Sequence, residues 1–301
     1  MVTRAQLLKE LEPGLNAIFG EEYNGYENEH LPLFDVESSN RAFEEEVLFP
    51  GFGAAAEKAE GQGVTYADTG ESWIARYSHK TIALAFAITE EAIEDNLYDS
   101  LSKRLTKFLA RSMAHTKQVD AANVYNRAFN SSYAGGDGVE LCDTGHPLVN
   151  GSTLSNRLNP DADLSETSLE SAIIAISKWT DDKGIPQSIG VKSLHIPTDS
   201  SFVAERILKS PLRVETADND INAMYSMSSV PGGWMVNHRF TDTDAWFLRT
   251  DCPNGMKHFE RKSVSSKMEG DFETGNVRYK SRERYSFGWS DWRGVYGSQG
   301  A

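Results

Sequence analysis

The feature that most restricts the fold is a long helical pattern that starts after Thr89. Thr89 is a favourable N-cap, and the acidic residues of the first turns are placed to interact with the helix dipole. The chain contains no glycine or proline from there to Gly135. A helix from Glu90 to about Arg127 would be about 57 Å long at 1.5 Å per residue. Its apolar stripe is too short for a coiled coil, so the pattern predicts a structural spine. The stripe consists of Ile93, Leu97, Leu101, Leu105 and Phe108.

A second strong pattern lies near the C-terminus, where large apolar and basic side chains alternate. Alternation with a period of two predicts a strand with two chemically different faces. The odd-numbered face carries Val277, Tyr279, Tyr285, Phe287 and Trp289, and the even-numbered face carries Arg278, Lys280, Arg282 and Arg284.

Before the spine, the sequence predicts an arm followed by β-structure. The first fifty residues are mostly polar, and a short amphipathic stretch at 6–19 is interrupted by Pro13 and Gly14, so we expect an irregular, extended arm. Two β-rich runs follow at 64–67 and 72–88, and in the second run large apolar residues alternate with alanines. This pattern predicts a long, partly exposed hairpin or strand system.

After the spine, helices and strands are mixed without a regular βαβ order. Thr167 and Glu170 predict a capping box for a helix whose buried face includes Leu169, Ile173, Ile176 and Trp179 or Thr180, and Gly184 and Pro186 end it. We then expect a strand at 192–196, a helix at 201–209, and strands at 233–238, 245–250 and 256–262. This order predicts the α+β class rather than a doubly wound sheet.

The charge distribution restricts the class of partner that the chain can bind. The net charge is −14, and residues 1–60 hold thirteen acids and four bases. An acidic chain is a poor candidate for a protein that binds nucleic acid through phosphates. The acidic runs, including Glu44, Glu45 and Glu46, are typical of a solvated surface; the alternative is a contact arm. The basic face at 278–284 could contact nucleic acid, but pairing with the acidic arm of the same or a neighbouring subunit is the better electrostatic match.

The chain shows few signs of catalysis, secretion or membrane insertion. It lacks the common nucleotide-binding, zinc-protease and serine-hydrolase motifs. The seven histidines are scattered, and the glycine-rich GGDG at 135–138 is expected to be a turn. Cys142 and Cys252 have no metal or disulfide spacing and are expected to be reduced thiols. Cys142 near His146 is a weak candidate nucleophile. We expect no catalytic, cofactor or metal site, no apolar signal segment and no membrane span.

Three stretches resemble a known family. They are IALAFAITEEAIEDNLYDSLSKRL at 82–105, NRAFNSSYAGGDGVELCDTGHP at 126–147 and NVRYKSRERYSFGWSDWRGVYGS at 276–298. With the order of arm, β-loop, spine and returning strand, they resemble the major capsid proteins of tailed bacteriophages (Caudoviricetes), which share the Hong Kong 97-type fold. The chain is most similar to the Mu-like major head subunits within that group.

The resemblance implies a division of the chain. It places an N-terminal arm at 1–46, an extended β-loop at 47–88, a peripheral domain with the spine helix at 89–164, an axial domain at 165–270 and a returning C-terminal strand at 271–301. The extended loop would lie across a neighbouring subunit. Some members of the family carry a long N-terminal scaffolding segment, whereas this sequence begins with the arm, so a scaffold is expected to be a separate protein. Lys58 and Lys80 lie in the loop region, but no motif identifies a covalent cross-link.

The resemblance implies a non-enzymatic, homo-oligomeric virion protein that assembles in the bacterial cytoplasm. Hexamers and pentamers would close into an icosahedral shell around double-stranded DNA, without sequence-specific binding. Expected partners are other copies, a portal, a separate scaffold and decoration proteins. The alternative functions are an encapsulin-like bacterial nanocompartment shell holding a cargo enzyme, and an enzyme that uses Cys142 and His146. The candidate inter-subunit contacts are Glu44, Glu45, Glu46, Trp73, Arg76, Arg278, Lys280, Arg282 and Arg284.

Overall fold

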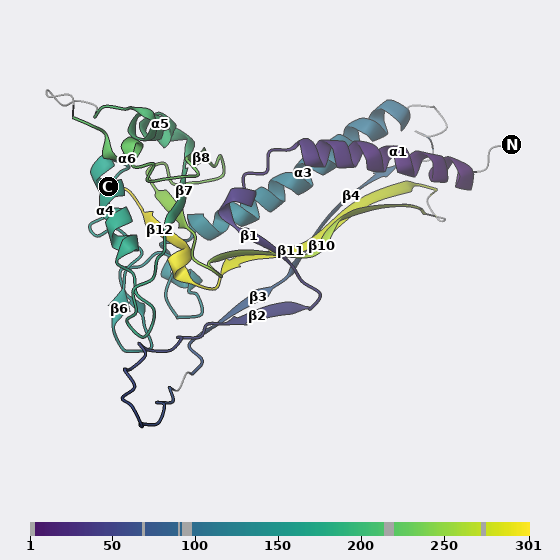
Figure 1. Ribbon diagram of the computed structural model, residues 1–301. Helices are drawn as coiled ribbons and strands as arrows, with labels where there is room; N and C mark the ends of the chain where they lie inside the picture. The colour runs from purple at the N-terminus through teal and green to yellow at the C-terminus, as the bar shows by residue number, and fades with distance from the viewer. Residues whose placement is uncertain (1–3, 68–69, 90, 92–97, 214–219, 272–274) are drawn as a thin grey trace.

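The computed structural model describes residues 4–67, 70–89, 91, 98–213, 220–271 and 275–301. Figure 1 shows an elongated part made of two long helices over long strands, and a compact part of short helices and strands that holds the C-terminus. A hairpin lies beneath their junction and carries a long loop that projects from the molecule.

The elongated part is a two-layer structure. Its four-stranded sheet has the order β1-β10-β11-β4, in which β4 is an edge strand, and all pairs except β1–β10 are antiparallel. Two helices cover one face of this sheet (Figure 1). The strands are β1 (Asp35–Ser38), β4 (Lys80–Ile88), β10 (Met256–Gly270) and β11 (Val277–Trp289), and the helices are α1 (Arg4–Gly25) and α3 (Tyr98–Asn126).

The core of the elongated part lies between the helices and the sheet. Side chains of α1, α3, β10 and β11 form one buried cluster, which includes Leu15, Phe19, Leu109, Met268 and Tyr279. The alternation predicted for 277–289 is confirmed as far as Tyr285, because the odd-numbered side chains from Val277 to Tyr285 are buried under the helices, whereas Ser286 is also buried and Phe287 and Trp289 are only partly buried. The even-numbered side chains from Arg278 to Arg282 are exposed on the opposite face.

The compact part is built on a second four-stranded sheet of order β12-β9-β7-β8. Trp179, Trp246 and Trp292 fill its core. Around it lie α4 (Glu166–Ser177), α5 (Ser201–Lys209) and α6 (Ala223–Ser226); the strands are β7 (Val191–Ile196), β8 (Trp234–Val236), β9 (Trp246–Thr250) and β12 (Val295–Ser298), with a small pair β5 (His146–Pro147) and β6 (Thr153–Leu154). Short 3-10 turns are η1 (Leu31–Leu33), η2 (Ser131–Tyr133), η3 (Thr198–Ser200) and η4 (Trp292–Gly294).

A separate antiparallel hairpin joins the two parts. It consists of β2 (Phe43–Val47) and β3 (Ile74–Ser78), and residues 48–73, hereafter the long loop, connect its strands. The buried side chains of β3, Ala75 and Tyr77, pack on Phe259 of β10. The hairpin therefore covers the open face of the sheet near the compact part.

Several predicted elements agree with the structure. The predicted helix at 201–209 matches α5, and the predicted strand at 192–196 lies within β7. The spine is confirmed over Tyr98–Asn126, whereas residues 90 and 92–97 of the predicted helix lie outside the described residues. The predicted β-structure at 72–88 becomes β3 and β4.

Other predictions were wrong. Residues 4–25 form one helix with Pro13 inside it, because Leu15 and Phe19 are anchored in the core under α1. Residues 64–67 form no strand, since no described strand lies beside them to complete a ladder. The N-cap of α4 is Ser165, in a capping box with Ser168. No helix in the described part of the chain is long and apolar enough to cross a membrane.

Candidate assembly surfaces

The long loop is exposed to solvent over most of its length. Every described residue of 52–67 is exposed, although the loop carries large apolar side chains. Tyr66 is 95% exposed, Val64 70%, Phe49 63% and Phe52 59%. The predicted contact residue Trp73 lies at the root of this loop and packs against the core of the compact part. The root is thus anchored, while the rest of the loop presents apolar side chains to solvent.

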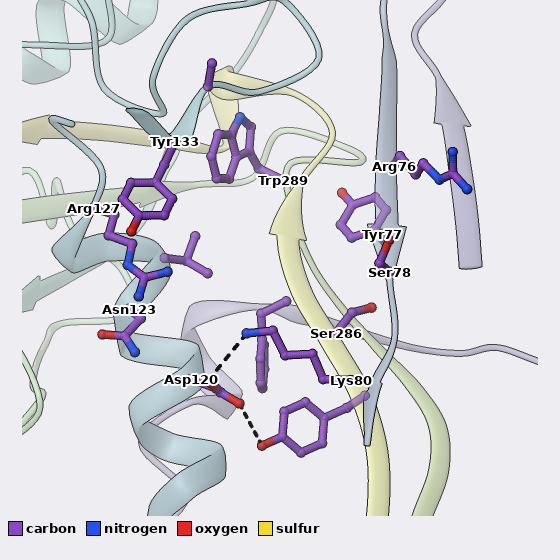
Figure 2. Close-up of a pocket in the computed structure, with 14 residues that line it drawn as sticks. Arg76, Tyr77, Ser78, Lys80, Asp120, Asn123, Arg127, Tyr133, Ser286 and Trp289 are labelled. Atoms are coloured by element: carbon purple, nitrogen blue, oxygen red, sulfur yellow. Dashed lines mark hydrogen bonds and ion pairs between the residues drawn. The ribbon is translucent and has the colours of Figure 1, made fainter. Parts of the chain in front are cut away.

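A cleft lies at the root of the hairpin, between β3, β11 and the C-terminal half of α3. It has a volume of about 260 Å³, and its lining is rich in cations, including Arg76, Lys80 and Arg127 (Figure 2). The Lys80 Nζ atom lies 3.7 Å from the Asp120 carboxylate, and the Arg127 guanidinium lies 4.4 Å from the centre of the Tyr133 ring. Arg76 points away from the cleft (Figure 2) and lies 3.6 Å from Glu45, so the cations that face the cleft are Arg127 and the ion-paired Lys80. The cleft is smaller than most small-molecule sites.

The three acids predicted as inter-subunit contacts lie on β2, where they form hydrogen bonds or ion pairs with other residues of the same chain. Glu46 accepts a hydrogen bond of 2.9 Å from the buried Lys257 and another from Ser290, so it fixes the hairpin to the sheet. Glu45 lies 3.6 Å from Arg76. Glu44 accepts a hydrogen bond of 2.7 Å from Ser39 and lies 3.8 Å from Arg41.

Of the four predicted bases on β11, Arg278, Lys280 and Arg282 are exposed, whereas Arg284 is half-buried near the hairpin, where it and Glu44 act in opposite directions on the pKa of His79. Arg278 pairs with Asp271 at 2.5 Å. Within the described residues, Lys280 and Arg282 have no ion-pair partner. Among the described residues, Glu44–Glu46 form no ion pair with these bases, because the hairpin holds the acids beside Arg76, Lys257 and Arg41. Pairing with a neighbouring subunit stays a prediction.

The sequence did not point to a second apolar surface, on the compact part. A cleft of about 590 Å³ lies between α5, α6 and β8, and its lining includes Met224, Tyr225 and Trp234. Phe202, 75% exposed, projects from the polar side of α5, and Met227 is equally exposed after α6. The amphipathic period of 201–209 is the signal that could have identified Phe202 as an apolar residue outside the core face.

The residues considered as catalytic candidates are buried in the structure. Cys142 and Cys252 are buried free thiols, and burial raises the pKa of both, which opposes formation of a nucleophilic thiolate. The His146 ring bonds Asp137 at 2.7 Å and Asn156 at 3.0 Å, and it stacks on Trp292. The described residues contain no group of three or more side chains placed to bind a metal ion.

The GGDG segment has a packing role. A Cβ atom at Gly135 would lie 2.7 Å from the Trp289 indole nitrogen, and one at Gly136 would lie 2.7 Å from the carbonyl oxygen of Ile74. Contacts this short exclude a side chain, so the glycines let the turn approach both β3 and β11. The predicted turn is confirmed, with close packing as its physical reason.

Comparisons with known proteins agree with this architecture. A family model described as phage capsid protein matches residues 74–298. No curated protein matches the chain. Among solved structures, the procapsid of bacteriophage JBD30 is similar with a TM-score of 0.53 and 16% identity, covering 99% of this chain and 76% of the other. The capsid of cyanophage P-SCSP1u has a TM-score of 0.54 and 11% identity, covering 89% and 86%. A virus-like particle from Pyrococcus furiosus has a TM-score of 0.51 and 10% identity, covering 94% and 97%.

Proposed function

The chain belongs to the phage capsid protein family, and from this membership we propose how it builds a shell. The predicted Hong Kong 97-type α+β fold is confirmed, and the chain is a major capsid protein. Its assignment to the Mu-like head subunits stays a prediction.

The long loop carries the proposal. Four large apolar side chains on a 26-residue connection are exposed in the single subunit, which is unfavourable unless another surface covers them. We therefore propose that the loop lies across a neighbouring subunit. We propose the arm at 1–46, the extended loop at 47–88, the peripheral domain at 89–164, the axial domain at 165–270 and the returning strand at 271–301, with two changes to these bounds. β10 belongs with the peripheral domain, because it lies in the long sheet, and β12 belongs with the axial domain, because it pairs with β9.

We further propose that hexamers and pentamers of this subunit close into an icosahedral shell that encloses double-stranded DNA. The shell forms in the bacterial cytoplasm and becomes part of the virion, and its other partners are portal, scaffold and decoration proteins. The subunit acts through its geometry rather than by catalysis. Buried, high-pKa thiols support this assignment. Substituting Cys142 by alanine is expected to leave assembly intact; an enzymatic activity lost on this change would contradict it.

The test is electron microscopy and sedimentation of the purified protein, alone and with the other head proteins of its phage. The wild-type subunit is expected to form capsomers, shells or tubes. Replacing residues 52–67 by a short glycine-serine linker should abolish them while leaving the circular dichroism spectrum of the subunit unchanged, because these residues are exposed. Val149→Ser, which removes an exposed apolar side chain elsewhere, is the matched control and should assemble normally.

Two outcomes would contradict the proposal. A wild-type protein of 33.4 kDa that stays monomeric in every mixture would exclude a shell subunit. Particles that contain a cargo enzyme rather than DNA, with a cargo protein encoded beside this gene, would instead indicate a nanocompartment shell.

A further inference from the structure

The two chain segments that lead into the hairpin meet at one side chain. Ser39 follows β1 directly, before β2 begins, and His79 is the single residue between β3 and β4. The His79 ring bonds Ser39 through Nε2 at 3.0 Å and Ser286 of β11 through Nδ1 at 3.0 Å. We call these three side chains the His79 bridge. The bridge joins both segments to the long sheet, so a change in the angle between hairpin and sheet would have to break it.

The neighbouring hydrogen bonds assign the protons of the His79 bridge. The Ser39 hydroxyl has one proton, which it donates to the Glu44 carboxylate at 2.7 Å, and its oxygen accepts from the Arg41 amide at 3.2 Å. His79 Nε2 must therefore carry a proton and donate it to the Ser39 oxygen. In a neutral ring Nδ1 is then an acceptor, and it accepts from the Ser286 hydroxyl. One tautomer of the neutral imidazole thus satisfies every bond of the bridge.

A second proton on the ring is incompatible with this arrangement. Protonated Nδ1 is a donor, so the buried Ser286 hydroxyl would have to turn its own proton towards another acceptor. A buried hydroxyl that loses its acceptor is unfavourable. Protonation of His79 would therefore weaken the link between the hairpin and β11.

The charges around His79 also favour the neutral ring. Arg284 on β11 and Arg261 on β10 repel a second proton, whereas Glu44 on β2 attracts it. Arg41, in the turn before β2, is exposed and lies 3.8 Å from Glu44, which reduces that attraction. Burial and the two guanidinium groups of the sheet together outweigh Glu44 and lower the pKa of His79 from its ordinary value. The folded subunit therefore holds the neutral ring at neutral pH.

A second attachment of the hairpin consists of Lys257, Glu46, Ser290 and Tyr77. Glu46 of β2 accepts a hydrogen bond of 2.9 Å from the buried Lys257, and it also accepts from Ser290, which is bonded to Tyr77 of β3 at 2.5 Å. None of these four side chains is a histidine, the type that ordinarily changes its charge between about pH 5 and 8. Loss of the His79 bridge in acid would therefore free one end of the hairpin and leave the end next to the compact part in place.

We propose that His79 is a pH-sensitive switch that fixes the hairpin on the long sheet. The neutral ring holds both entering segments on β11, and the charged ring releases the end of the hairpin where Phe43 pairs with Ser78. The switch is a property of the single subunit. Its consequence rests on the proposed function: acid changes the direction in which the hairpin presents the long loop, and this lowers the yield of particles.

Hydrogen exchange of the unassembled subunit at pH 7.5 and pH 5 tests the switch. After correction for the intrinsic exchange rates, protection of the amides at 43–44 and 77–78 should fall about tenfold in acid, the size expected for the loss of a buried hydrogen bond. Protection at 46–47 and 74–75 should change less than about twofold, because Lys257 still holds that end. The nitrogen chemical shifts of the His79 ring should show a proton on Nε2 and none on Nδ1 at pH 7.5.

Three variants isolate the contribution of His79. His79→Gln keeps a donor and an acceptor but cannot titrate, so its hairpin should stay protected at both pH values. His79→Phe keeps a ring but removes both bonds, so its hairpin should already show the low protection at pH 7.5. His115→Gln, at an exposed histidine of α3, is the matched control and should reproduce the pH dependence of wild type. Circular dichroism verifies that every variant folds.

The results separate the switch from the shell function. Equal pH dependence of the hairpin in wild type and His79→Gln would overturn the switch, and so would a proton on Nδ1 at pH 7.5; wild-type shells would then leave the proposed function standing. The predicted exchange in a subunit that never forms particles would instead refute the proposed function. The particle yield of wild type should fall from pH 7.5 to pH 5 by more than that of His79→Gln. An equal fall in both proteins would refute the proposed link between the switch and assembly.

Discussion

The two faces of β11 differ in what surrounds them. Tyr279, Glu283 and Tyr285 on one face are buried beneath α1 and α3, and each makes a hydrogen bond to a helix residue. Arg278, Lys280 and Arg282 on the other face are exposed. The period of two along one strand thus separates residues that hold the subunit together from residues available to other subunits. We call the face buried under the helices the closed face and the exposed face the open face. Substitutions on the closed face should change the free energy of unfolding, and substitutions on the open face should change assembly.

The largest effect is expected at Tyr279 on the closed face. Its ring packs in the core between the helices and the sheet, 5.5 Å from the Phe86 ring, and its hydroxyl donates to Asn16. Tyr279→Ala should lower the free energy of unfolding by about 3–5 kcal/mol through the lost burial and the cavity. Tyr279→Phe, which removes only the hydrogen bond, should cost about 1 kcal/mol. Urea denaturation of the unassembled subunit measures both, and a loss below 1 kcal/mol for Tyr279→Ala would contradict the assigned role of the closed face.

A buried ion pair gives the next largest effect. Glu283 on β11 lies 3.6 Å from Lys117 on α3 and accepts a hydrogen bond of 2.9 Å from Tyr23 on α1. Burial raises the pKa of Glu283, with Lys117 acting in the opposite direction, so the pair does not fully offset its desolvation. Glu283→Ala should lower the free energy of unfolding by about 3 kcal/mol, because the charge of Lys117 is left without its partner.

The double variant is the decisive comparison for that pair. Lys117→Met with Glu283→Leu removes both charges together. In a Tyr23→Phe background, which takes away the hydroxyl bonded to Glu283, its free energy of unfolding should lie within about 1 kcal/mol of that background. A double variant that lost as much free energy of unfolding as Glu283→Ala would show that the ion pair itself stabilises the fold. The loss in Glu283→Ala would then not be due only to the unpaired charge of Lys117.

The sequence predicted best where local pattern and packing coincide. The alternation at 277–289 needs only the period of a strand, and both faces of β11 follow it as far as Arg282. The bounds of α5 were predicted because Pro211 and the apolar residues mark them locally. The helix α1 was missed because Pro13 and Gly14 are local breakers, whereas burial of Leu15 and Phe19 against distant strands stabilises the helix.

The candidate contacts were less predictable. Glu44, Glu45 and Glu46 are identical in type and adjacent in sequence, yet Glu46 binds Lys257 and Ser290 while Glu45 faces Arg76. Such partners depend on the register of β2 with β3 and on how the hairpin lies on the sheet. The basic row was visible in the sequence, but the opposition of Lys280 and Lys267 follows from the register of β10 and β11.

Acid should weaken the closed face through two buried histidines. His258 stacks on Phe287 at 4.3 Å between ring centres and lies edge-on to His30 at 5.5 Å. Burial, with Lys117 adding repulsion, lowers the pKa of His30 to about 4 and that of His258 to about 3. Because these values lie below the ordinary 6.5, the folded state favours the neutral rings. The contribution of the neutral rings to the free energy of unfolding is complete above pH 6.5 and is lost progressively as the pH falls towards 3.

His258→Phe tests this dependence. Neither ring nitrogen of His258 has a hydrogen-bond partner among the described residues, so phenylalanine should keep the packing at neutral pH. Between pH 7.5 and 5, wild type should lose about 2 kcal/mol more than the variant, as a histidine with these pKa values requires. Urea denaturation at both values measures the difference. Equal pH dependence in the two proteins would show that His258 is protonated in the folded state with an ordinary pKa, which would contradict the effect of its burial.

The smallest effect, and the one that separates the two faces most sharply, is expected at Lys280. Lys280→Ala removes both a repulsion with the opposite Lys267 and an attraction to Glu269, whose pKa Lys280 helps to lower, so the two losses offset and the free energy of unfolding should stay at the wild-type value. Salt should not separate the two proteins, because exposed charges are screened. Arg282 lies opposite Ser265, so Arg282→Ala is the matched control and should also leave stability unchanged. Lys280 is one of the predicted inter-subunit contacts, so the same Lys280→Ala change should lower the yield of particles. Assembly would then fall at constant stability, whereas substitutions on the closed face lower stability. A Lys280→Ala subunit that is less stable than wild type would show that this lysine serves the fold.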